Sequence, residues 1–185
     1  CHMDTISRPL MQGMPNRMAH RHWFPGSGIP KRAGIETKGL SGMAFYPDQL
    51  QKQYGADDSI TYEIKLVNEE AGHRLPTGDP ERFYLIELQW TDIANDTIIQ
   101  QETFRIGETW EWYPEARKLS DNNLNPKESR VFSITMMPHD PGQYRLKVLV
   151  TKHRMDDKTA VYNKLGDEYP LFIEVFSEEQ VIEIK

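Results

Sequence analysis

Alternation of apolar and polar residues dominates the chain from Ser59 onward. Residues 60–66 carry an apolar side chain at every second position, which is the period of a strand with one buried face. The same period recurs at residues 84–90, 132–136, 144–150 and 171–175, and two further strands are expected at 97–106 and 181–184. About seven short strands separated by turns predict an all-β fold, an antiparallel immunoglobulin-like β-sandwich.

The residues before this region follow a different pattern. Residues 1–45 are rich in Pro, Gly and Met and show neither a helical nor a strand period. We therefore expect an extended, irregular arm at residues 1–45 and the β-sandwich domain at residues 46–185. Short helices are expected at 48–54 and between 156 and 165. Because the arm has few clustered aliphatic side chains to offset the entropy of ordering its backbone, it has to lie on another surface.

Composition and charge narrow the class of protein. The 185 residues are 38% hydrophobic and 27% charged, as in a globular domain, and no run approaches the roughly 18 apolar residues of a transmembrane helix. The net charge is −6, yet six basic residues face two acidic ones through Lys38, which gives the arm +4 and the remainder −10. An acidic body argues against nucleic acid as its partner, whereas the basic arm can approach an anion.

Sequence signatures of enzymes are missing. One cysteine excludes an internal disulfide and a Cys-rich zinc site, and the chain has no Gly-rich phosphate loop, GxSxG or HExxH. Histidine and cysteine instead occur in three short segments: Cys-His-Met at residues 1–3, His-Arg-His-Trp-Phe-Pro-Gly at 20–26, and Gly-His-Arg-Leu-Pro-Thr-Gly-Asp-Pro at 72–80.

These segments resemble the carboxy-terminal region of bacterial multihaem c-type cytochromes. Residues 1–3 look like the end of a CxxCHM haem-attachment motif that lacks its first cysteine and the two intervening residues. Residues 20–26 are similar to the HRFPG-type segment that follows the last haem motif in such proteins, and residues 68–82 to the stretch that opens their β-sandwich tail. Residues 110–112 and 121–130 also look like that tail, so the resemblance spans most of the chain.

The resemblance implies covalently bound haem c, with several haems in the full protein and an arm that contacts haem. It assigns to haem Cys1 and His2 of the attachment motif, His20, His22 and His73 as candidate iron ligands, and Arg17, Arg21, Trp23 and Phe24 as contacts of the propionates and the porphyrin. For His73, an imidazole hydrogen-bonded to backbone in a tight loop is an equal alternative. His139 and His153 are expected at the surface.

The function implied is electron transfer by an exported protein, periplasmic or at the cell surface. Two histidines on one iron leave no position for a substrate, which favours an electron carrier over an enzyme. The implied partners are other haem domains or redox proteins, and a homo-oligomer is possible; neither nucleic acid nor a transmembrane segment is expected.

Three alternatives stay open from the residues. Cys1-His2-Met3 can be vector-encoded, or the start of a mature lipoprotein. The chain can be an immunoglobulin-like surface binding module without haem. It can also be the tail of a multihaem oxidoreductase whose active haem lies upstream.

Overall fold

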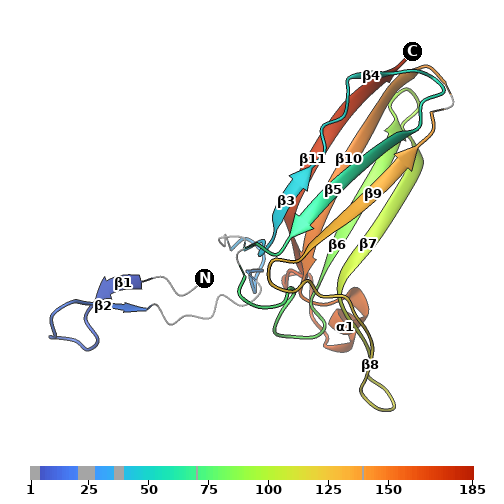
Figure 1. Ribbon diagram of the computed structural model, residues 1–185. Helices are drawn as coiled ribbons and strands as arrows, with labels where there is room; N and C mark the ends of the chain where they lie inside the picture. Colours follow the sequence, from blue (N-terminus) through green and yellow to red (C-terminus); the bar gives the residue numbers. More distant parts are fainter. Residues whose placement is uncertain (1–4, 21–27, 36–39, 70, 139) are drawn as a thin grey trace.

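Two β-sheets packed face to face form the body of the protein, as a computed structural model shows for residues 5–20, 28–35, 40–69, 71–138 and 140–185 (Figure 1). The elements in these residues are β1 (Thr5–Arg8), β2 (Arg17–His20), β3 (Ala44–Pro47), β4 (Gln53–Tyr54), β5 (Ile60–Val67), β6 (Phe83–Asp92), β7 (Thr97–Glu111), β8 (Arg117–Asp121), β9 (Ser129–Met136), β10 (Gly142–His153), α1 (Asp157–Tyr162) and β11 (Phe172–Ile184). None of the helical residues described forms a segment long and apolar enough to cross a membrane.

The larger sheet has the strand order β4-β11-β10-β6-β7-β8, and the smaller has the order β3-β5-β9. Every pair of neighbours is antiparallel except β4 and β11. The all-β, immunoglobulin-like sandwich predicted from the alternating pattern is therefore confirmed.

The core lies between the sheets and follows the predicted alternation. Along β5, burial alternates residue by residue, and Tyr62, Ile64 and Leu66 are fully buried while the side chains between them are exposed. β6 contributes Tyr84 and Trp90 to the same core from the opposite sheet. Burying a large apolar side chain stabilises a fold by roughly 1.5–3 kcal/mol, so the inner faces of these strands fix the register of both sheets.

Several details differ from the prediction. The two strands expected near the carboxy terminus are one strand, β11, and the exposed strand β8 was not predicted. The helix expected between 156 and 165 is confirmed as α1, with Asp156 accepting a hydrogen bond from the Thr159 N–H at its amino terminus.

The helix expected at residues 48–54 is wrong. Its backbone groups form hydrogen bonds to strands β5 and β11 rather than to one another. The Asp48 N–H donates to the Glu63 carbonyl, and Gln180 of β11 accepts from the Leu50 N–H and donates to the Asp48 carbonyl, at 2.9 and 2.7 Å. This segment leads into β4, so tertiary hydrogen bonds override its local helical pattern.

The amino-terminal region contains a β-hairpin that the sequence pattern did not predict. β1 and β2 pair from Thr5 opposite His20 to Arg8 opposite Arg17, and Figure 1 shows the hairpin standing apart from the sandwich. The expected boundary at residues 45 and 46 falls inside β3, which pairs with β5.

Candidate functional site

One end of the sandwich holds the chain segment that leads from the arm into the body. This segment, residues 28–35 and 40–43, is named the docked segment here. Its Ile29 and Met43 are buried. Tyr84 donates a hydrogen bond to the Ser41 carbonyl (2.6 Å), and Lys152 Nζ donates to the Leu40 carbonyl (2.6 Å). The chain therefore enters the sandwich at a fixed place, next to the loops that precede β6 and follow β10.

Three cationic side chains lie at this end of the sandwich: Arg82, Lys152 and Arg154, named here the cation cluster. Lys152 is only 9% exposed. Burial, and then the positive charge of Arg82, lower the pKa of Lys152 to about 8. Arg154 donates to the carbonyls of Ile29 and Pro30, at 2.8 and 3.2 Å, and also donates to the Tyr169 hydroxyl.

The cation cluster lacks an anionic counterpart among the residues that the structure describes. None of the ion pairs within the described ranges involves Arg82, Lys152 or Arg154. The Nε atoms of both arginines are buried without a hydrogen-bond partner. Because buried donors and charges are costly when they have no partner, this end of the sandwich is suited to receive an acceptor.

The loop from Asn68 to Arg82 forms one wall of this end and explains much of the motif that it carries. Asn68 is fully buried, and its Nδ2 donates to the carbonyls of His73 (2.8 Å) and Leu124 (3.1 Å). Leu75 and Leu124 exchange two backbone hydrogen bonds, of 2.9 and 2.8 Å. The loop is therefore tied to the residues between β8 and β9.

Gly78 and Arg82 close the same loop. Arg82 Nη1 donates to the Thr77 carbonyl at 2.7 Å, and a Cβ on Gly78 would lie 2.6 Å from that nitrogen. Gly78 also has φ of +91°, which favours glycine. The packing of the Arg82 guanidinium therefore requires a glycine at position 78.

His73 lies exposed in this loop, with its Nδ1 3.0 Å from the Arg74 carbonyl oxygen. This contact fits the backbone-bonded role that the sequence left open for it. The neighbouring Arg74 donates two hydrogen bonds to Asp121, of 2.9 and 2.5 Å, and is the main reason that the pKa of Asp121 lies well below its usual value.

The other predicted haem residues fall in two groups. Arg17 and His20 lie at the two ends of β2, in the hairpin. Cys1, His2, Arg21, His22, Trp23 and Phe24 lie outside the described residues. Within the described ranges, no three His, Cys, Asp or Glu side chains gather to hold a metal ion. The assignment of the iron ligands and haem contacts stays a prediction.

His153 is not the surface residue expected. Its ring stacks between Phe83 and Phe172, at centroid distances of 4.4 and 5.0 Å, and its Nε2 lies 2.8 Å from the Thr151 hydroxyl. Burial lowers the pKa of His153 to about 4, so the imidazole is neutral at pH 7. The sequence pattern could not show that aromatic residues occupy the positions facing His153 on both neighbouring strands.

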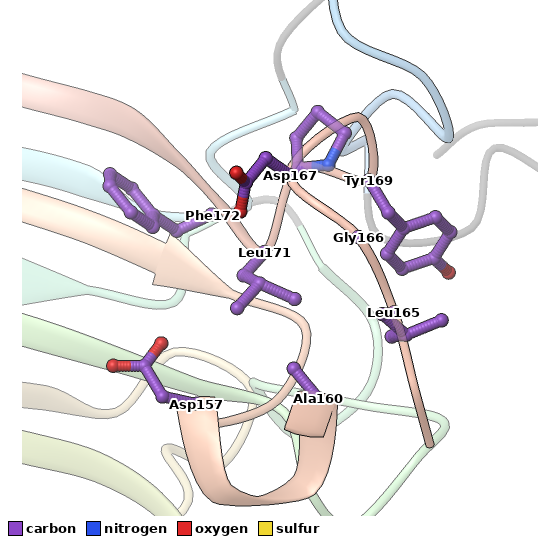
Figure 2. Close-up of a pocket in the computed structure, with 9 residues that line it drawn as sticks. Asp157, Ala160, Leu165, Gly166, Asp167, Tyr169, Leu171 and Phe172 are labelled. Carbon is purple, nitrogen blue, oxygen red and sulfur yellow. The ribbon is translucent and has the colours of Figure 1, made fainter. Parts of the chain in front are cut away.

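A hollow of about 350 Å³ adjoins this aromatic stack, between α1 and the segment that leads to β11 (Figure 2). It is lined by Asp157, Ala160, Leu165, Gly166, Asp167, Tyr169, Pro170, Leu171 and Phe172. Its volume is at the low end for a ligand site, and its lining residues include no imidazole or thiol that could bind haem iron.

The β7–β8 hairpin carries an exposed aromatic surface. The rings of Trp110 and Trp112 stack at 5.2 Å with an interplanar angle of 7°, and Lys118 Nζ lies 5.4 Å from the centre of the Trp110 ring. Trp112 is 49% and Tyr113 86% exposed. Exposed tryptophan and tyrosine on a rigid hairpin are typical of contact surfaces.

The fold is shared with part of a solved cytochrome. A penta-haem cytochrome c552 from Thermochromatium tepidum matches 84% of this chain with a TM-score of 0.57 and 13% sequence identity. The chain spans 46% of that cytochrome's length. At this identity, the likeness establishes the common β-sandwich fold alone.

Other solved structures are less similar. A β-glucosidase from Listeria innocua in complex with isofagomine matches 80% of this chain and 17% of its own, with a TM-score of 0.39 and 12% identity. A CARDB domain from Pyrococcus furiosus matches 77% of this chain and 94% of its own, with a TM-score of 0.36 and 13% identity. No protein-family model and no curated protein sequence matches the chain.

Proposed function

We propose that this chain is the carboxy-terminal part of an exported multihaem c-type cytochrome and takes part in electron transfer. The observation that carries the proposal is the sandwich shared with a penta-haem cytochrome over 84% of the chain. Residues 1–3 and 20–26, which resemble haem-binding segments, precede that sandwich in the sequence. The chain has one cysteine and hence no complete CxxCH, so any haem bound through Cys1 also needs a cysteine outside this sequence.

The exposed apolar side chains of the β1–β2 hairpin suit contact with the edge of a haem better than contact with water. Its turn and second strand expose four apolar side chains, Leu10, Met11, Met14 and Met18, each between 50% and 68% accessible. An isolated two-stranded hairpin is marginally stable at best, so these side chains need an apolar surface. His20 offers an imidazole and Arg17 a guanidinium on the same hairpin, which suit iron and a propionate respectively.

Haem, when bound, supplies reversible one-electron chemistry at iron. In the proposed arrangement, His20 or His22 would hold the haem iron together with a second histidine, which would leave no position on the iron for a substrate. The sandwich supports the arm: Tyr84 and Lys152 fix the docked segment, and through it the point from which the arm departs.

Reduction and reoxidation of the native full-length protein test this proposal. We expect dithionite to produce the sharp α-band of low-spin haem c, and a soluble redox protein to reoxidise it without consuming any small substrate. A protein with no visible absorption, or one whose haem reacts only with a small substrate, would contradict electron transfer as the function. Recovery from the periplasmic or surface fraction of the native host tests export.

Replacing a candidate iron ligand tests whether the arm binds haem. In the full-length protein, His20→Ala or His22→Ala should convert one haem from low to high spin and leave the β-sheet circular dichroism unchanged, because both positions precede the first sandwich strand, β3, in the sequence. His73→Ala serves as the comparison. If both arm variants keep a low-spin spectrum, neither histidine is the ligand.

A surface binding module without haem is the second candidate. The exposed Trp112 and Tyr113 on the β7–β8 hairpin favour it, because such residues dominate protein contact surfaces. Haem content separates the two candidates, since a binding module purified from its native host would be colourless.

A further inference from the structure

We propose that Arg82 and Lys152 together bind a carboxylate group, and that in the haem-loaded protein this group is a haem propionate. The inference rests on the proposed function and adds to it a role for the sandwich itself, because both side chains belong to the body of the protein and not to the arm.

The strand register brings the two cations together. Lys152 of β10 lies directly opposite Tyr84 of β6, and Arg82 precedes Tyr84 by two residues. Arg82 lies in the loop immediately before β6, and Lys152 Nζ lies 5.8 Å from the centre of the Tyr84 ring, so both cations are at the same end of the larger sheet. After burial, the positive charge of Arg82 is the second cause that lowers the pKa of Lys152, in keeping with two neighbouring cations.

The simplest explanation for two neighbouring cations, Arg82 and Lys152, is an anion that binds to both of them. Lysine is almost never this deeply buried without a partner of opposite charge, and a second cation beside it raises the cost. The nearest acidic residues along the chain are engaged elsewhere: Asp79 Oδ1 accepts from the Glu81 N–H at 3.0 Å, and Glu81 accepts a long hydrogen bond from Thr159. In the described ranges no carboxylate forms an ion pair with either cation.

The unused donors suit a carboxylate. Lys152 Nζ has three N–H groups, and its hydrogen bond to the Leu40 carbonyl uses one of them. Arg82 uses Nη1 for the Thr77 carbonyl, while its Nε is buried with no acceptor. Guanidinium and ammonium groups bind carboxylates through short, charge-assisted hydrogen bonds. Arg154 differs, because two backbone carbonyls and the Tyr169 hydroxyl already occupy its terminal nitrogens.

Two carboxylates are candidates for this place. One is a haem propionate, and the other is the side chain of Glu36, which lies outside the described residues and stands four positions before Leu40 in the sequence. We assign the propionate because each haem brings two propionates, whereas Glu36 is the single acidic residue of the chain between Asp4 and Asp48.

The test is a spectroelectrochemical titration of the native holoprotein and its variants. A propionate that loses its neighbouring cation places more negative charge near iron, which stabilises the oxidised state. We therefore expect Lys152→Met to lower the midpoint potential of one haem and leave the others unchanged. Lys147→Met, on an exposed position of the same strand, should change none of the potentials. Glu36→Gln should also change none.

The outcomes distinguish a failure of the proposed function from a failure of this inference. A wild-type protein without haem defeats the proposed function and this inference together. Haem present with all potentials unaffected by Lys152→Met defeats only the inference. A Glu36→Gln variant that raises the potential of the haem whose potential Lys152→Met lowers assigns the carboxylate to Glu36 instead, because it removes a negative charge from the same place. If Lys152→Met does not fold, Arg82→Lys keeps the charge but removes Nε. It should shift the propionate bands in the resonance Raman spectrum, and unchanged bands would overturn the assignment.

Discussion

Asn68 holds together the loop that forms one wall of the candidate site, and replacing it with alanine should destabilise the sandwich. Its side chain is fully buried and donates to the carbonyls of His73 and Leu124. The Leu124 carbonyl keeps the Leu75 N–H as a second donor, and His73 is exposed to water, so neither carbonyl loses every partner. Two hydrogen bonds at about 1 kcal/mol each, with a small cavity in addition, give a loss of about 2–3 kcal/mol.

Urea unfolding of the full-length protein, followed by circular dichroism at pH 7, measures this loss. With a slope of roughly 1–3 kcal/mol per molar urea, the midpoint of Asn68→Ala should fall by about 0.7–3 M. Asn163→Ala is the matched control, because Asn163 is exposed at the end of α1, and it should cost under about 0.5 kcal/mol. Equal midpoints for the two variants would refute the role given to Asn68.

Three further predictions concern single positions. Gly78→Ala should reduce the free energy of unfolding by about 1–3 kcal/mol, because the new Cβ meets Arg82 and the backbone has positive φ. The thermal unfolding temperature should therefore fall, and an unchanged temperature would contradict this. His153 has a pKa lowered from 6.5 to about 4, so the unfolded chain takes up its proton first, and stability should fall as pH drops from about 6.5 to 4. A His153→Phe variant should lack that part of the fall in pH-dependent melting, and an NMR pKa above 6 would refute the account. Asp121→Asn removes the partner of Arg74 and should speed amide exchange in β8 at pH 7, while costing under about 1 kcal/mol of global stability. In the wild-type protein the same loosening should occur only in acid, as pH falls below the ordinary pKa of Asp121, 3.8.

The strands with one buried face could be predicted from the sequence because one physical rule governs them. Burial along β5 alternates with the period that the sequence shows, and so the face of each central strand was known in advance. β8 escaped prediction because all five of its residues are exposed and carry no apolar alternation. The segment at 48–54 was mispredicted because Gln180, 130 residues after Leu50, supplies its hydrogen bonds, and a local pattern contains no information about such a partner.

The candidate site could be predicted only in part. The motif at 68–82 marked a functional or tight loop, and the structure shows how Asn68, Gly78 and Arg82 build it. The cation cluster was missed. Lys152 continues the buried positions 144, 146, 148 and 150 of β10, but the strand expected from the sequence ended at residue 150. Its place opposite Tyr84 depends on the register, which joins residues 68 positions apart and is set only when the sheet forms.

Covalent haem is the central claim, and its most direct measurement is the pyridine haemochrome spectrum of the native full-length protein after denaturation and extraction with acidified acetone. Thioether-linked haem stays with the polypeptide through this treatment, whereas non-covalent haem is removed. We predict a c-type haemochrome in the protein fraction, and a haem-bearing peptide that includes Cys1 and His2 after proteolysis. A colourless protein fraction, with the peptide of Cys1 at its unmodified mass, would contradict the account.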